Sequence, residues 1–285
     1  MTSLVMHSAR PTPLASLLVP AHLVRTLWSR RELIGQFSRR YFYARYRGTH
    51  LGAIWAFISP LLMLAVYTFV FNYIFRARNP SADVTNSQFA VLLFCGISVY
   101  GIFSESVTRS SSLVLDNPNY VKKVVFPIEV LPVSSVASSL MFSSFSMLLV
   151  VLGTWVTYGR VPWTIVLIPL VLLPLVLLAL GLAWFLASLG VFVRDISNLV
   201  VLLVSQLLFF LTPIFYRVEN LPERLRPIAE LNPLAHIVEG ARRVLVLGEQ
   251  PDWAALGLVT LVGLLSMQLG YAWFMKSKRG FADVL

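Results

Sequence analysis

Long apolar runs alternate along this chain with short segments that hold most of its charged residues. Crossing the hydrocarbon core of a bilayer takes about 20 helical residues, so each long run predicts a transmembrane helix. Leu51 to Phe75 is the clearest case, because it contains no Asp, Glu, Lys or Arg. The other predicted spans are Phe89 to Thr108, Pro127 to Thr157, Pro162 to Val193, Ile196 to Tyr216 and Trp253 to Met275.

Composition agrees with an all-α integral membrane protein. Hydrophobic residues make up 57% of the 285 residues and charged residues 13%, against about 25% charged in ordinary soluble domains. The net charge of +10 does not indicate a nucleic-acid partner, because the basic residues lie beside apolar spans. Cys95 is the only cysteine, so one chain forms no disulfide and no thiolate metal site.

Basic residues also predict the orientation in the membrane. Six spans place both termini on one side, and a cytoplasmic location for them assigns 15 of the 23 Lys and Arg residues to the cytoplasm and 8 to the outside. This asymmetry follows the positive-inside rule. We therefore expect residues 48–275 to hold six spans and residues 276–285 to form a cytoplasmic tail.

The segment before the first span predicts an interface helix. Residues 1–21 are an N-terminal extension with no assigned role, and residues 22–47 have helical apolar periodicity. Such a helix lies on the inner leaflet, although Arg30 and Arg45 interrupt its apolar face. A basic arm that only sets the topology is the alternative. The apolar face comprises Leu23, Leu27, Leu33, Ile34, Phe37 and Tyr41.

Residues 117–126 predict a short cytoplasmic helix between the second and third spans. Asn117 or the preceding aspartate is a suitable helix cap, and Pro118 suits the first turn. The helix carries Lys122 and Lys123, which alone would indicate only topology. A capped, proline-bounded helix is better explained as a docking element.

Residues 217–252 form the longest outer loop and contain a second amphipathic pattern. Asn232 and Pro233 supply a cap and a start, and apolar positions then recur at helical spacing beside Arg242 and Arg243. A helix re-entering the membrane interface and an ordinary surface hairpin are both compatible with this periodicity. The apolar positions are Ile237, Val238, Ala241, Val244 and Leu245.

Few ionisable residues lie in or beside the spans. Glu105 and Glu129 are near the inner ends of spans two and three, so we expect interfacial ion pairs and no proton relay. Arg109 follows Glu105 by four residues and is its expected partner. Arg194 and Asp195 are expected to fix a tight cytoplasmic turn.

Motifs for catalysis or cofactor binding are missing. We find no glycine-rich phosphate loop, no zinc-ligand spacing and no Gly-x-Ser-x-Gly elbow. An integral membrane transferase would need His, Asp or Glu residues that converge at one membrane face, and the loops offer no such set. We therefore expect no cofactor and no enzymatic activity.

Five short motifs occur in an order typical of one family. They are Ala44 to Gly52 with Trp55 and Pro60 to Leu62, then Asn117-Pro118 to Lys122-Lys123 with Phe126-Pro127, then Arg194-Asp195, then Thr212-Pro213 to Phe215-Tyr216, and finally Asn232-Pro233. In these features the chain resembles the ABC-2 permeases that export bacterial polysaccharides (O-antigen, capsule or teichoic acid), over roughly residues 25–280.

The resemblance implies a half-transporter in the bacterial inner membrane. Two copies of the chain would form the pore, two copies of a separate ABC ATPase would bind below, and the cargo would be a lipid-linked polysaccharide. By the same resemblance, the outer loop forms re-entrant gate helices, and the interface and 117–126 helices contact the ATPase. The implied coupling residues are Asn117, Pro118, Tyr120, Lys122, Lys123, Arg45 and Arg47.

Aromatic rings are candidates for the polysaccharide path, because their flat faces contact sugar rings without fixed hydrogen bonds. Packing or an interfacial belt is the alternative for each ring, and the serine-rich face of span three (Ser134, Ser135, Ser138, Ser139) is the alternative lining. An exporter of a small amphiphile or drug and a non-catalytic assembly subunit remain alternative functions. The candidate rings are Trp55, Tyr67, Phe71, Tyr100, Phe103, Trp184, Phe209 and Phe210.

Overall fold

The computed structural model describes residues 20–70, 73, 85–122, 126–216, 218, 221–224 and 226–284. Within these ranges every regular element is a helix, which confirms the all-α prediction. Five helical segments are long and apolar enough to cross a membrane. They are Gly52–Phe69 with α4 (Trp55–Phe69), α5 (Asn86–Ser110), α7 (Val130–Tyr158), Trp163–Phe192 with α8 (Ile168–Phe192), and Trp253–Gly280 with α13 (Trp253–Ser277).

The predicted fifth span is shorter than the other five. It comprises α9 (Ile196–Leu202), a π-helical turn (Leu203–Leu208) and α10 (Phe209–Leu211). At 1.5 Å per residue the segment is about 24 Å long. It ends where it does because Pro213 disfavours a helical residue before it, and Thr212 is extended. The count of six spans therefore stays a prediction.

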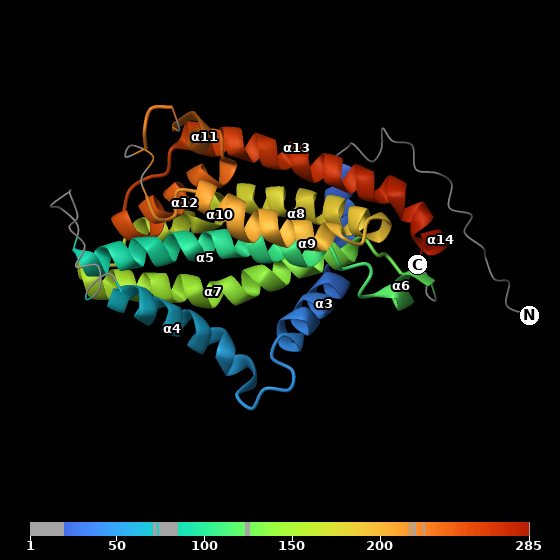
Figure 1. Ribbon diagram of the computed structural model, residues 1–285, viewed down its shortest axis with the longest axis horizontal. Helices are drawn as coiled ribbons and strands as arrows, with labels where there is room; N and C mark the ends of the chain where they lie inside the picture. Colours follow the sequence, from blue (N-terminus) through green and yellow to red (C-terminus); the bar gives the residue numbers. More distant parts are fainter. Residues whose placement is uncertain are drawn as a thin grey trace, which may run out of the picture.

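The long helices form an elongated bundle in which α5, α7, α8 and α13 run side by side (Figure 1). Small residues allow α8 and α13 to approach each other closely. A Cβ atom added at Gly270 would lie 2.0 Å from the Gly181 carbonyl oxygen, and one added at Gly181 would lie 2.4 Å from the Ser266 carbonyl oxygen. Glycine is therefore required at both positions.

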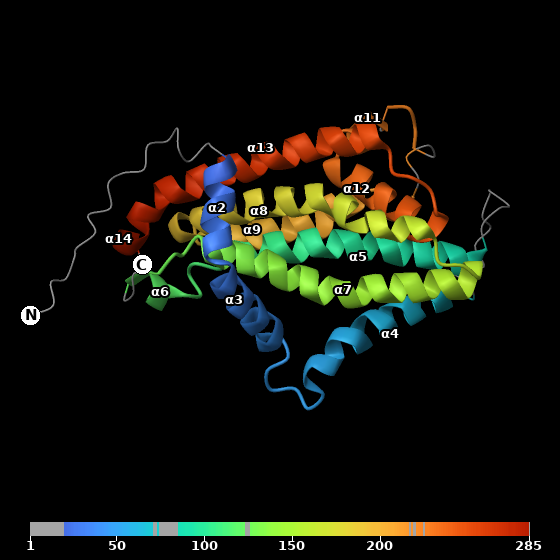
Figure 2. The same ribbon diagram turned by 180° about the vertical axis from the view of Figure 1, so that it is seen from behind.

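The predicted interface helix is two helices. α2 (Pro20–Ser29) and α3 (Arg31–Ala44) are separated at Arg30, whose φ of −110° and ψ of 14° are not helical. The predicted apolar face is largely buried, and α3 packs along α7. Figure 2 shows α3 and α4 joined by a turn at the apex of a V, with α4 diverging from the bundle towards that turn.

The two ends of the bundle carry different elements (Figures 1 and 2). One end, named the α6 end, holds α6 (Pro118–Lys122), α14 (Phe281–Val284) and the α2–α3 junction. The other, the α12 end, holds α11 (Arg226–Glu230) and α12 (Pro233–Arg242) with its continuation Arg243–Leu247.

α12 begins as the sequence predicts. The Asn232 side chain accepts a hydrogen bond from the Leu234 amide (3.0 Å), and Pro233 occupies the first turn. The apolar face, including Ile237 and Ala241, is buried against α5 and α8. This burial contradicts the surface-hairpin alternative, whereas re-entry into the membrane stays a prediction.

Candidate functional site

An aromatic cluster attaches α6 to α3. The Tyr120 ring on α6 lies 5.5 Å from the Phe37 ring on α3 and 4.7 Å from the Phe126 ring (centroid distances). Arg40 donates a hydrogen bond to the Tyr120 hydroxyl (2.6 Å). We call these four residues the α6 cluster. Because aromatic pairs contribute about 0.5–1.5 kcal/mol beyond their burial, the cluster favours movement of α6 and α3 as one body.

Asn117 and Pro118, two other predicted coupling residues of this segment, have local roles in the start of α6. The Asn117 side-chain amide donates to the Leu113 carbonyl (2.9 Å), and Pro118 starts α6. Lys122 is the last residue of α6, but its side chain is outside the described part of the structure, as is the whole of Lys123. The role of the two lysines stays a prediction.

Arg45 forms an ion pair that joins the turn after α3 to α5. Its guanidinium lies 2.7 Å from the Glu105 carboxylate and 4.2 Å from the centroid of the Phe142 ring. The predicted pair of Glu105 with Arg109 is wrong. Arg109 lies over the Tyr41 ring on α3 instead, 4.8 Å from its centroid. Arg47 is exposed in the turn that follows α3.

The contact between Arg109 and Tyr41 is a cation–π interaction and not an ion pair. Burial raises the pKa of the Tyr41 hydroxyl to about 12, although the nearby Arg109 and Arg40 charges oppose this shift. The hydroxyl is therefore neutral at physiological pH. Arg109 thus fixes α5 against α3 through the face of the ring.

A second ionic cluster lies at the α6 end; the sequence predicted an ion pair for Glu129 but not its partners. The Glu129 side chain is 3% exposed; one of its carboxylate oxygens pairs with Arg30, and the other lies 2.8 Å from the Lys278 ammonium. We call these three residues the Glu129 cluster. Trp184 also donates a hydrogen bond to the Glu129 backbone carbonyl (3.0 Å).

A signal for both ion pairs was present in the sequence. Arg30 and Arg45 are the two residues that interrupt the apolar face of the predicted interface helix. In the structure they pair with Glu129 and Glu105, which lie near the inner ends of predicted spans three and two. A basic residue on the apolar face of a helix needs a counter-ion, so these two positions called for a carboxylate from another segment.

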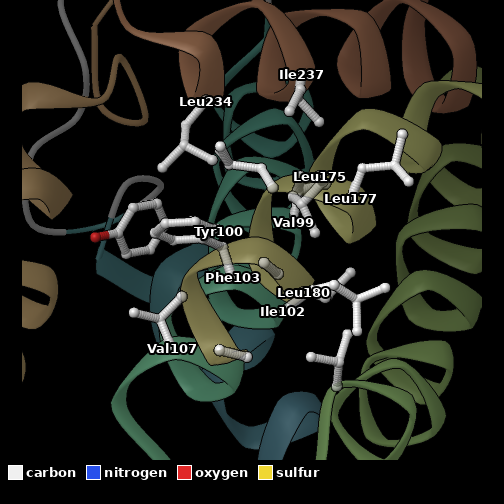
Figure 3. Close-up of a cluster of buried hydrophobic side chains, with 14 of the residues drawn as sticks. Val99, Tyr100, Ile102, Phe103, Val107, Leu175, Leu177, Leu180, Leu234 and Ile237 are labelled. Carbon is white, nitrogen blue, oxygen red and sulfur yellow. The ribbon is translucent and has the colours of Figure 1, made fainter. Parts of the chain in front are cut away.

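Several of the aromatic path candidates are packed inside the chain. Tyr100 and Phe103 are 3% and 2% exposed, within the cluster in Figure 3, and Tyr100 donates a hydrogen bond to the Val204 carbonyl. Trp184 is fully buried, and Phe209 packs 5.3 Å from Tyr100. The Tyr100, Phe103 and Trp184 rings are therefore closed to solvent in this conformation of one chain, whereas the Phe209 ring is half-buried.

The remaining path candidates are more accessible. Trp55 and Tyr67 are half-buried on α4, and Phe210 on α10 is 62% exposed. Phe71 lies outside the residues that the structure describes.

A cavity of about 190 Å³ lies between α4, α5 and α7. The predicted serine face of span three does not line it: Ser134 is buried, and its hydroxyl bonds the Val130 carbonyl (3.0 Å). Other serines of these helices contribute instead. The lining residues are Ser59, Pro60, Met63, Phe94, Ile97, Ser98, Gly101, Glu105, Phe142, Ser143 and Ser146.

A buried arginine fastens the α12 end. Arg242 is 8% exposed, and its guanidinium donates hydrogen bonds to the carbonyls of Leu92 (3.1 Å), Pro213 (3.0 Å) and Ile214. A Cβ atom added at Gly96 would lie 3.0 Å from this guanidinium, so a glycine there leaves it room. The contacts join α12 to α5 and to the end of α10.

The remaining predicted turn lies between α8 and α9. Arg194 and Asp195 occupy it, and the Ser197 hydroxyl donates to the Arg194 carbonyl (3.2 Å). Among the described residues no group of three or more His, Cys, Asp or Glu could hold a metal ion. The charged residues described above form contacts that hold elements of the bundle together.

Comparison with known proteins agrees with this architecture. The family model for ABC-2 type transporters matches residues 32–246. The O-antigen export system permease protein RfbA of Myxococcus xanthus is 31% identical over 265 residues, which cover 92% of this chain and 98% of the relative. A protein of the same name from Klebsiella pneumoniae is 28% identical over 259 residues, covering 89% and 95%. The polysialic acid transport protein KpsM of Escherichia coli is 23% identical over 233 residues, covering 80% and 86%. The chain therefore belongs to the ABC-2 type transporter family.

Proposed function

We propose that this chain is the transmembrane subunit of an ATP-driven exporter that moves a lipid-linked polysaccharide across the bacterial inner membrane. The observation that carries the proposal is the similarity to O-antigen export permeases along nearly the whole length of both chains. The similarity to a polysialic acid transport protein supports a polysaccharide cargo and leaves O-antigen and capsule both open.

The proposed complex contains two copies of this chain and two copies of a separate ABC ATPase. The sequence has no phosphate-binding loop of its own, so the energy must come from another subunit. The α6 cluster supports docking of that subunit at the α6 end, because it makes α6 and α3 a firmly packed pair.

Co-expression with the ATPase tests this proposal. We expect the purified chain to hydrolyse no ATP, and the complex to hydrolyse ATP and to export polymer in proteoliposomes. A Walker lysine variant of the ATPase is the control for contaminating activity. Turnover by the isolated chain that persists with that control would contradict the proposal.

The proposed orientation places the α6 end in the cytoplasm. In a Cys95→Ser background, a cysteine at Ser277 should react with a membrane-impermeant maleimide only after the cells are permeabilised. A cysteine at Gln250, which is exposed at the other end of α13, should react in intact cells. The reverse labelling pattern would place the termini outside.

The proposed polysaccharide path uses the accessible rings on α4 and α10. Replacing Tyr67 or Phe210 with Leu keeps apolar bulk but removes the flat face, so export should fall several-fold at an unchanged amount of folded dimer. Tyr100→Leu is the contrasting variant. It should lower the free energy of unfolding by about 1–3 kcal/mol, because the buried Val204 carbonyl loses its hydrogen bond from the hydroxyl.

The measurement is surface polysaccharide per folded dimer, together with the thermal stability of each purified variant. Normal export by both accessible-ring variants would reject the aromatic path. The serines that line the cavity between α4, α5 and α7 would then be the better candidates.

A further inference from the structure

The Glu129 cluster brings together three segments that are far apart in the sequence. Arg30 is 99 residues from Glu129, and Lys278 is 149 residues away. Arg30 occupies the break between α2 and α3, Glu129 directly precedes α7, and Lys278 directly follows α13. The side chains of Arg30 and Lys278 are 35% and 31% exposed, so two partly exposed cations contact one buried carboxylate.

The charges make the three positions depend on one another. A buried carboxylate is costly unless it is paired, and removing one partner of a buried pair leaves the other uncompensated. Glu129 holds two cations at once, so removal of its charge would leave Arg30 and Lys278 facing each other as like charges. The three charges are therefore fully compensated only when all three segments are in place.

A compact turn, residues 126–130, connects Glu129 to Phe126 of the α6 cluster. Two backbone hydrogen bonds between residues close in the sequence stabilise this turn. The Ile128 amide donates to the Phe126 carbonyl (2.9 Å), and the Val130 amide donates to the Pro127 carbonyl (3.0 Å). Phe126 itself belongs to the α6 cluster. A displacement of α6 thus reaches Glu129 through the contact of the Tyr120 ring with the Phe126 ring and through the turn after Phe126.

The chain after Ser277, named the tail (residues 278–284), also contacts α6. Its helix α14 packs against α6 and α8. The Phe281 ring is fully buried, 5.5 Å from the Phe274 ring and 5.9 Å from the Phe192 ring. The tail is therefore packed against the α6 end of the bundle.

We propose that Glu129 is a positioning residue that links α6 to the α2–α3 junction and to the tail, so that the tail takes part in coupling ATP hydrolysis to export. The Trp184 hydrogen bond anchors the Glu129 backbone to α8, which gives the moving elements a fixed point. This inference rests on the proposed function, because coupling has meaning only in an ATP-driven exporter.

Matched pairs of variants test the link. Lys278→Met and Arg30→Met remove one cation each from the cluster. Lys276→Met and Arg31→Met remove a neighbouring exposed cation that forms no ion pair in the described part of the chain. In the complex with the ATPase, the cluster variants should keep ATPase binding but export about tenfold less polymer per ATP hydrolysed, within the range of typical allosteric coupling. The control variants should match the wild type.

Exchanging the charges separates positioning from folding. Glu129→Lys alone should abolish export, and the double variant Glu129→Lys with Lys278→Glu should restore much of it, because one anion again lies among two cations. Failure of the double variant to export while it still forms the ATPase complex would overturn the inference. Equal export per ATP by Lys278→Met and Lys276→Met would overturn it as well.

Hydrogen–deuterium exchange gives a readout that needs no transport. In the purified chain, the tail should exchange faster in Lys278→Met and Glu129→Gln than in the wild type or Lys276→Met. Unchanged exchange in both would refute the link. If the tail responds as expected but the wild-type complex exports no polymer, the structural link stands and the proposed function fails.

Discussion

Export of polysaccharide should fall to background when Tyr120 is replaced with Ala and a glycine is inserted after Val121. The replacement removes the ring that joins α6 to Phe37 and Phe126 and the hydroxyl that bonds Arg40. The insertion shifts the helical register and adds a residue that costs about 1 kcal/mol in a helix. Motion of the ATPase would then bend α6 instead of moving α3 with it.

The chain should still insert and dimerise, because α6 is outside the long helices. A glycine inserted after Arg160, in the exposed turn between α7 and α8, is the matched control and should leave export near the wild-type level. Surface polymer is measured against the amount of dimer in the membrane. Normal export by the α6 variant would contradict a coupling role for α6 and would leave it only a role in setting the membrane topology.

Arg242→Met should lower the free energy of unfolding more than Tyr100→Leu does. Methionine matches the length of the stem but cannot donate to the Pro213 and Ile214 carbonyls, which lie in a buried, non-helical segment. Each unsatisfied buried acceptor costs about 1–3 kcal/mol, so we expect a loss of about 2–6 kcal/mol. The α12 end should loosen first.

Arg243→Met is the matched control, since Arg243 is adjacent and its side chain is 39% exposed, with the Glu239 carboxylate 3.7 Å away. Exposed ion pairs contribute at most about 1 kcal/mol, so this variant should unfold near the wild-type midpoint. Thermal unfolding of purified dimers distinguishes the two. Equal midpoints would show that the Arg242 hydrogen bonds do not hold the α12 end together.

Apolar length and local turn chemistry made much of the fold predictable. The second predicted span, Phe89 to Thr108, lies inside α5, and Asn232 with Pro233 starts α12 as expected. A transmembrane helix must be long enough to cross the lipid, and a helix cap must bond the free amides of the first turn. Both features therefore depend on residues that are close together in the sequence. The break at Arg30 was not predicted, because Arg30 pairs with Glu129, a residue distant in the sequence.

The sequence did not show which face of each span is buried and which face contacts lipid. In lipid, both the buried and the lipid-facing sides of a helix are apolar, so periodicity does not separate them. Tyr67 and Tyr100 therefore looked alike, whereas the structure leaves the first half-buried on α4 and buries the second against Val204. Burial of a ring in such a bundle depends on which helices meet, and that is a property of the folded chain.

The most direct test of the central claim is to deplete this chain in its bacterium and measure lipid-linked polysaccharide inside the cell and on its surface. We expect polymer to disappear from the surface and to accumulate, still attached to its lipid, at the cytoplasmic side of the inner membrane. Re-expression of the wild type should reverse both changes. A membrane transferase would instead leave the cell with no polymer, and an exporter of a small amphiphile would leave surface polymer unchanged. Either of these results would contradict the account.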